Sequence, residues 1–124
     1  MIPVNQLGIY LPHEVEFVGG GDRWTLYSLR ATGAIVLKNG LHTEPIHQSN
    51  VGVEYQPILR PMKSLTRDEK DLYFSETYGY MSTWKNELNF TAWKLNWFIQ
   101  RKFDVFGLIE QGLATDYYSI SNVG

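Results

Sequence analysis

Apolar and polar residues alternate along much of the first sixty positions, as in strands that bury one face of a sheet and leave the other wet. Val15 and Phe17, for example, alternate with glutamates. Pro45 interrupts the fourth such stretch, and its missing N–H suits a strand end or an edge strand. The stretches that predict strands are 14–18, 24–30, 34–38, 41–44 and 51–55.

Glycine-containing turns separate these stretches and support an antiparallel meander. Gly19-Gly20-Gly21 supplies a permissive backbone for one reversal. Asn39-Gly40 is the strongest hairpin signal, because both residues tolerate the positive φ of a type I′ turn. Pro57 and Pro61 bias the residues before them away from helix, so this segment is expected to leave the sheet in an extended form.

After Pro61 the chain contains no further proline, and its pattern favours helices. Thr66 and Glu69 have the spacing of a capping box, which predicts a short helix that starts at Arg67. This helix is expected to reach the neighbourhood of Tyr73.

A longer helix is predicted over residues 90–103, with Asn89 as its N-cap, because this stretch contains neither glycine nor proline. A terminal strand is expected around 116–120. Together these elements predict an α+β fold in which a sheet of about five antiparallel strands is packed by the C-terminal helix. All 124 residues are expected to form a single domain, with a β-meander layer over 10–60 and a helical, aromatic layer over 62–124.

The predicted C-terminal helix carries two apolar faces. Leu95, Ile99 and Phe103 form one of them, which suits packing on the sheet. The second must be covered by the aromatic segment 73–84, by a second copy of the chain or by a partner protein. Tryptophan flanked by basic residues is typical of interface hot spots and of platforms on which bases stack. The residues predicted to form this contact face are Phe90, Trp93, Lys94, Trp97 and Arg101.

Arg60 lies between two prolines, in the segment that must pass from the sheet to the helices. Its guanidinium is therefore well placed to make several fixed hydrogen bonds. We predict that Arg60 is a structural clamp rather than a ligand site, with Asp104 or Asp116 as its partner. Asp104 and Glu110 are themselves expected to be cap or turn residues.

Composition and charge exclude several classes of site and partner. The chain has a formal net charge of −2 and contains no cysteine. The lack of cysteine excludes disulfides, thiolate metal sites and a cysteine nucleophile, and it fits a reducing cytoplasm. The slightly acidic balance argues against binding of double-stranded nucleic acid, which normally requires a basic surface. No apolar run approaches the ~18 residues that span a bilayer, so no membrane partner is expected.

Candidate catalytic and metal-binding groups are few. His42, Glu44 and His47 could supply three ligands to zinc, since residues 42 and 44 share one face of a strand. Short motifs of this kind are often fortuitous, and polar residues on a wet hairpin are the simpler interpretation. No segment combines a nucleophile with a base and an orienting group. We therefore expect no enzyme activity, no metal and no cofactor.

The order of three motifs resembles a family of small uncharacterised proteins encoded by bacteriophages and prophages of gut Bacteroidetes. In this chain the motifs are Tyr10-Leu11-Pro12, residues 56–68 (QPILRPMKSLTRD) and residues 103–114 (FDVFGLIEQGLA). In the family they look like LPYGLK, KPILRPLSDLTKEI and HFDVFGLIEKGLAID. The chain has Lys63-Ser64, Glu69 and Lys102 where the family has Ser-Asp, Ile and His. The resemblance implies a phage origin and a shared fold, and it carries no known activity, cofactor or catalytic residue.

These observations favour a non-enzymatic phage or prophage accessory protein in the bacterial host cytoplasm. It is expected to act by protein–protein contact or self-association through the face that contains Trp93 and Trp97, and modulation of a host or defence protein would fit its small size. The alternative is single-stranded nucleic-acid binding by the same aromatic and basic residues. A salt titration distinguishes the two, because contacts to phosphate weaken steeply as salt rises.

Overall fold

The computed structural model describes the backbone of residues 2–83 and 87–121, and the side chains of these residues apart from 4, 80–83, 87–91, 120 and 121. Six strands form one sheet in the order β4-β3-β2-β1-β5-β6. All neighbouring pairs are antiparallel except β5 with β6. The predicted α+β fold is therefore confirmed. The strands are β1 Glu16–Gly19, β2 Asp22–Leu29, β3 Ile35–Asn39, β4 His42–Ile46, β5 Gln56–Leu59 and β6 Thr115–Asp116.

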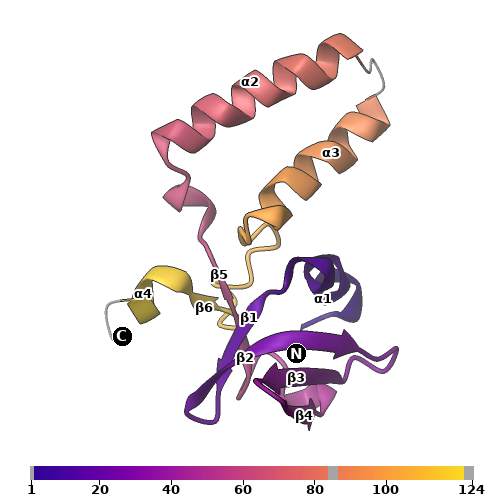
Figure 1. The fold of residues 1–124 in the computed structure, drawn as a ribbon, viewed down its shortest axis with the longest axis vertical. Helices are drawn as coiled ribbons and strands as arrows, with labels where there is room; N and C mark the ends of the chain where they lie inside the picture. Colours follow the sequence, from indigo (N-terminus) through magenta and orange to yellow (C-terminus); the bar gives the residue numbers. More distant parts are fainter. Residues whose placement is uncertain (1, 84–86, 122–124) are drawn as a thin grey trace.

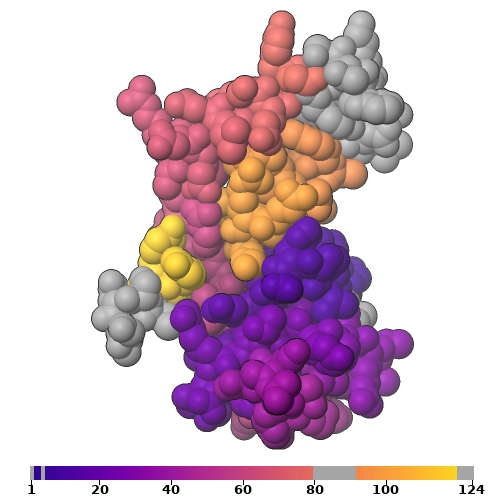
Figure 2. Space-filling model, in the orientation of Figure 1, coloured from indigo at the N-terminus to yellow at the C-terminus, as the bar shows by residue number. Residues whose placement is uncertain are grey.

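The helices fall into two groups around this sheet (Figure 1). α2 and α3 run antiparallel to each other and form a hairpin that projects away from the sheet, whereas α1 lies beside it. A space-filling view shows α2 and α3 packed along each other above the body that contains the sheet (Figure 2). The helices are α1 Val4–Tyr10, α2 Arg67–Thr83, α3 Glu87–Gln100 and α4 Tyr117–Ser121, with short 3-10 turns at Leu11–His13, Gln48–Asn50 and Met62–Ser64.

The hairpin between β3 and β4 forms where it was predicted but has a different turn. Asn39 pairs with His42, so the two central residues are Gly40 and Leu41. Gly40 has a φ of 61° whereas the φ of Leu41 is not positive, which is typical of a type II′ turn, since the predicted type I′ turn needs positive φ at both central residues. Leu41 is consequently placed at the tip, where it is fully exposed.

The fifth strand lies at 56–59, not at the predicted 51–55. Gly52 has a φ of 90° and its N–H donates to the carbonyl of Tyr55, so the alternating stretch closes a turn instead. Pro57 lies inside β5, opposite Phe17 of β1. Three consecutive residues from Pro57 to Leu59 are buried, so both faces of β5 are covered, and its two edges are paired with β1 and β6.

Pro45 does not end the fourth strand, which continues to Ile46. β4 is instead the last strand in the sheet order, which agrees with the alternative that Pro45 marks an edge strand. A proline on a free edge removes one backbone donor that another chain could use for pairing. At the other edge, the predicted strand around 116–120 is reduced to the two residues of β6, and α4 follows directly.

The main hydrophobic core is built from both halves of the sequence. Phe17, Leu37 and Leu59 of the sheet are fully buried together with Leu7 of α1 and Ile99 of α3. Tyr10, at the end of α1, is also buried, and its hydroxyl donates to the carbonyl of Phe103 and accepts from the N–H of Val105. A second, smaller cluster consists of Trp97, Phe98 and Phe103, with Leu65, Tyr73, Trp93 and Val105 packed against it.

α3 begins and ends three residues earlier than predicted, so Asn89 lies inside the helix and is not its N-cap. The helix ends in a Schellman motif. The N–H of Lys102 donates to the carbonyl of Ile99 at 2.8 Å, and the N–H of Phe103 donates to the carbonyl of Phe98 at 3.1 Å. The rings of Phe98 and Phe103 then meet edge to face at 5.8 Å, as the motif's hydrophobic contact requires. Lys102 has a φ of 63°, a position that glycine normally occupies.

Replacing Lys102 by glycine is expected to stabilise the protein. The left-handed backbone costs a lysine about 1–2 kcal/mol, and subtracting the greater unfolded-state entropy of glycine leaves a gain of about 0.5–1 kcal/mol. Urea unfolding measures this change. The matched control Lys94→Gly, at an exposed position inside α3, should lower the free energy of unfolding by about 1 kcal/mol. A Lys102→Gly variant as unstable as the control would contradict the assigned helix end.

Candidate functional site

The indole of Trp97 is sealed inside the helical hairpin, with 3% of its surface exposed. Tyr73 of α2 contacts it edge to face at 5.1 Å, and the Arg101 guanidinium lies 3.7 Å from the ring centre. The indole N–H donates to a carboxylate oxygen of Glu76 at 2.6 Å. Both the apolar surface and the polar atom of Trp97 are therefore satisfied within one chain.

This arrangement corrects the expectation that Trp97 is an exposed contact residue. Of the three possible covers for the second face of α3, the structure contains the first, the aromatic segment that begins at Tyr73. Trp93 is half-buried and stacks on the same tyrosine ring at 6.2 Å, whereas Lys94 is exposed. The side chain of Phe90 lies outside the described residues.

The face of α3 that contains Leu95 and Ile99 was predicted to pack on the sheet along its length, and it does not. Ile99 is fully buried in the main core, but Leu95, one turn earlier, is 37% exposed. The reason is visible in Figure 1, where only the C-terminal end of α3 reaches the body and the rest of the helix extends away with α2. The two apolar faces of α3 are thus divided between the sheet and α2.

α2 carries the two most exposed aromatic side chains of the described residues. Phe74 is 66% exposed and Tyr78 is 80% exposed. They are four residues apart in a helix, so they lie one turn above the other on the same side. We call this pair the α2 ridge. Sequence reasoning missed the α2 ridge because α2 was expected to end near Tyr73, and the i, i+4 spacing of two aromatics is the signal that identifies it.

Arg60 joins the sheet to the base of the hairpin. Its two terminal nitrogens donate to the two carboxylate oxygens of Glu69 at 2.8 and 2.7 Å. The guanidinium also lies 4.1 Å from the centre of the Phe103 ring. On the backbone, the N–H of Arg60 donates to the carbonyl of Lys102, and its carbonyl accepts from the N–H of Asp104. One residue therefore connects the end of β5, the start of α2 and the segment after α3.

The predicted acidic partners of Arg60 were wrong. The carboxylate of Asp104 is buried and accepts the backbone N–H groups of Leu108 and Ile109, each at 2.8 Å, so Asp104 caps the following turn as expected. Asp116 accepts the backbone N–H of Tyr118 at 2.9 Å. Arg60 instead pairs with Glu69, nine residues later in the sequence, and Glu69 also takes part in a capping box.

The capping box predicted from Thr66 and Glu69 is confirmed. The N–H of Glu69 donates to the Thr66 hydroxyl at 3.1 Å, and the N–H of Thr66 donates to Glu69 at 3.0 Å. α2 begins at Arg67, as predicted, but continues to Thr83. Hydrogen bonding from Arg60, the largest effect, lowers the pKa of Glu69 to about 2. The pKa of Arg60 is raised by the same bond, so both groups stay charged at neutral pH.

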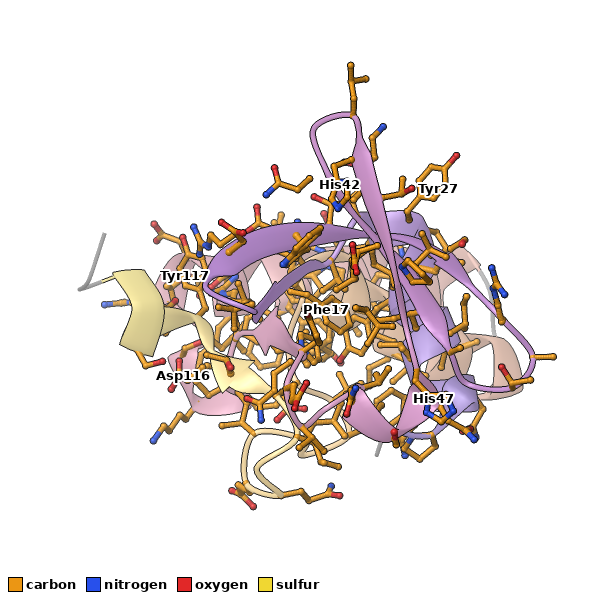
Figure 3. All side chains as sticks on the ribbon, turned by 90° about the horizontal axis from the view of Figure 1, so that it is seen from below. Phe17, Tyr27, His42, His47, Asp116 and Tyr117 are labelled. Atoms are coloured by element: carbon orange, nitrogen blue, oxygen red, sulfur yellow. The ribbon has the colours of Figure 1, made fainter. Side chains whose placement is uncertain are left out.

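The three candidate metal ligands on the β4 hairpin do not converge. His42 Nε2 lies 3.0 Å from Glu44 Oε2, so these two side chains share a face as predicted. His47 Nδ1 instead lies 2.8 Å from the Ser49 hydroxyl. Figure 3 shows His42 and His47 well separated along the sheet. Over residues 2–83 and 87–121, no group of three or more His, Cys, Asp or Glu side chains is arranged to hold a metal ion.

Comparison of the chain with protein-family models, with curated proteins and with solved structures gives no match. Within the described part of the chain, no helix has both the length and the apolar character needed to cross a membrane.

Stability should fall in acid because of Glu69. Its pKa is lower in the folded chain than in the unfolded chain, so the stabilisation is complete above about pH 5 and is lost as the pH falls towards 2. After allowance for solvent screening, we expect Glu69→Gln to cost about 1–2 kcal/mol at pH 7. Glutamine retains an acceptor for the capping box, so the change isolates the charge. Urea unfolding at pH 7 and pH 2.5 should show this difference shrink in acid; a difference that persists at pH 2.5 would contradict the ion pair.

Trp97→Ala should lower the free energy of unfolding by about 3–5 kcal/mol, because it opens a cavity in the small aromatic cluster and leaves Glu76 without its donor. Urea unfolding and molar mass in solution test this together. Tyr78→Ala removes an exposed aromatic from the same hairpin and should change stability by less than about 0.5 kcal/mol. A Trp97→Ala chain that changes from a dimer to an equally stable monomer would show that Trp97 is a contact residue after all.

Proposed function

We propose that the chain is a phage or prophage accessory protein that acts in the host cytoplasm by protein–protein contact or self-association, and that the α2 ridge makes the contact. The observation that carries the proposal is the exposure of Phe74 and Tyr78 on a hairpin that extends away from the sheet (Figures 1 and 2). Aromatic side chains are enriched at protein interfaces, where they bury large apolar areas at a small entropy cost.

The location of the α2 ridge supports a contact role. The hairpin's own core, around Trp97 and Phe98, is complete without Phe74 and Tyr78 at its centre. Tyr78 therefore lies outside the hairpin core, and Phe74 contacts its edge through the ring of Tyr73 at 5.8 Å, so each would gain from leaving water. Phe74 borders the side of α2 that carries Tyr73, with the two rings 5.8 Å apart, and the exposure of Phe74 and Tyr78 makes them accessible to a partner without rearrangement of the body.

The contacts around Trp97 favour a protein partner over single-stranded nucleic acid. Base stacking needs an open aromatic face beside a basic groove. The face of Trp97 is already occupied by the Arg101 guanidinium, and Arg101 also donates to the Trp97 carbonyl at 2.9 Å. A nucleic-acid strand would have to displace this pair before a base could stack there.

The distribution of perturbed ionisable groups supports a role without catalysis. Strongly shifted pKa values often mark active sites. The Tyr10 hydroxyl has a raised pKa because it is buried, and it bonds to backbone groups of Phe103 and Val105. Arg60 and Glu69 owe their shifts mainly to each other. Each of these groups holds two segments of the chain together.

Modulation of a host or defence protein is the role that we propose for this contact, on the strength of the resemblance of the chain to phage proteins. A soluble host protein with an apolar groove for one helix face would suit the α2 ridge, since two aromatics one turn apart are read as i and i+4 anchors.

A double variant, Phe74→Ser with Tyr78→Ser, is expected to abolish the contact while the fold is retained. Self-association is measured by sedimentation across a range of protein concentrations, and partner contact by a photo-reactive amino acid at position 74 in host cells. Truncation of an aromatic side chain at a hot spot costs about 2 kcal/mol or more of binding free energy, so association should weaken at least thirtyfold.

Leu41→Ser is the matched control, because Leu41 is fully exposed but lies at the tip of the β3–β4 hairpin. It should leave association and cross-linking unchanged. Wild-type chain that stays monomeric and gives no position-dependent cross-links would refute the proposal. Cross-links to single-stranded nucleic acid that disappear with rising salt would favour the alternative function.

A further inference from the structure

A small hollow lies where the base of the hairpin meets the sheet, separate from the α2 ridge. It has a volume of about 250 Å³. Its walls come from β1, β5, the end of α3 and α4, four segments that are distant in the sequence. The residues that line it are Glu16, Ile58, Arg60, Arg101, Lys102 and Tyr117.

Three of the six lining residues are cations, and two of these form no ion pair with an acidic side chain that the structure describes. Arg60 is neutralised by its two hydrogen bonds to Glu69. Across the part of the chain that the structure describes, no carboxylate forms an ion pair with Arg101 or Lys102. Both side chains are nevertheless half-buried. Burying charge without a counter-charge is unfavourable, so the hollow has a local excess of positive charge that an anion would relieve.

Arg101 is held in place before any ligand arrives. Its guanidinium is stacked on the Trp97 ring at 3.7 Å, and one of its nitrogens donates to the Trp97 carbonyl. A guanidinium has five N–H donors, so donors remain for a ligand. Fixing a cation in this way reduces the entropy that binding would otherwise cost.

Lys102 provides a second, independent indication. It adopts a left-handed conformation, with a φ of 63°, at the helix end where glycine is favoured. A strained backbone position that retains a charged side chain often marks a functional site. Here the strained residue is also one of the two lining cations that form no ion pair among the described residues.

The one carboxylate in the lining does not cancel this charge. Glu16 is half-exposed and lies 3.8 Å from Arg23, which is outside the hollow. With Arg60 paired to Glu69, the lining retains two positive charges, on Arg101 and Lys102, and one negative charge, on Glu16. Tyr117 adds a hydroxyl that can donate to an anion, and Ile58 forms an apolar wall.

We infer that this hollow binds a single phosphate group, either as free phosphate or as the monoester of a small molecule. Arginine and lysine together match the geometry and charge of a phosphate dianion. The volume is below the roughly 300–1,000 Å³ of pockets that hold drug-sized ligands, so the group that enters has few atoms. The inference is independent of the function proposed for the α2 ridge.

An NMR titration of backbone amides tests the site at constant ionic strength, with inorganic phosphate and glycerol 3-phosphate as separate probes and chloride as the balancing anion. Wild-type chain should show saturable shifts that centre on residues 101, 102 and 117. Tighter binding of inorganic phosphate would identify free phosphate as the ligand, and tighter binding of glycerol 3-phosphate would identify a monoester; both results support the site.

Lys102→Gly should weaken phosphate binding at least tenfold, as expected for loss of a charge-assisted hydrogen bond. Because this variant is expected to be more stable than wild type, its weaker binding cannot arise from unfolding. Lys102→Arg keeps the charge and should bind within about threefold of wild type. The control Lys94→Gln removes an exposed lysine from α3, away from the hollow, and should bind as wild type does.

Three results would overturn the inference. The first is no saturable shift in wild-type chain up to about 10 mM phosphate, which corresponds to negligible affinity. The second is equal binding by Lys102→Gly and wild type. The third is an equal loss of binding in Lys94→Gln and Lys102→Gly, which would indicate a non-specific charge effect.

Discussion

The ion pair of Arg60 with Glu69 is the contact on which the arrangement of the two parts of the molecule depends. It spans the segment between the end of β5 and the first turn of α2, so it fixes the direction in which the helical hairpin leaves the sheet. The guanidinium also stacks on Phe103, which follows α3. Both helices of the hairpin are thus anchored at one charged group, and the pair is largely shielded from water, with each side chain 20% exposed.

With its base fixed in this way, the hairpin completes its own core. Tyr73 contacts Trp93, Trp97 and Phe98, so the aromatic residues of α3 that were expected to need a partner are satisfied by α2. In an αα-hairpin each helix has only one neighbouring helix, so the part of its surface that does not face that neighbour stays uncovered. The part of α2 that does not face α3 is left in water, which is why the exposed aromatics described on the hairpin are Phe74 and Tyr78 rather than Trp93 and Trp97.

Local signals were the ones that sequence reasoning interpreted correctly. The start of α2 follows from Thr66 and Glu69, and the β3–β4 hairpin follows from Gly40, because each depends on residues a few positions apart. The fold class also follows, since strand and helix periodicities differ.

Contacts between different elements could not be predicted in the same way. The salt-bridge partner of Arg60 was chosen among distant aspartates, whereas the nearby Glu69 was already assigned to a cap. α1 was not predicted, because a seven-residue helix with no side-chain cap bond is stabilised by packing, in this case of Leu7 and Tyr10, and not by its own sequence. Whether Trp97 is buried or exposed depends on which element covers it. A helical wheel cannot show this, because it describes one helix alone.

The buried contact between Tyr10 and the backbone at Phe103 and Val105 has a consequence for synthesis of the protein. It joins residues separated by 93 and 95 positions, and Ile99 and Leu108 fill the same core as the N-terminal strands. When only the strands of the sheet have left the ribosome, the nascent chain therefore still lacks the later side chains that complete its hydrophobic core. Folding of the body must wait until residues 99–108 have emerged, and during that interval the Pro45-containing edge of β4 limits pairing between neighbouring incomplete chains.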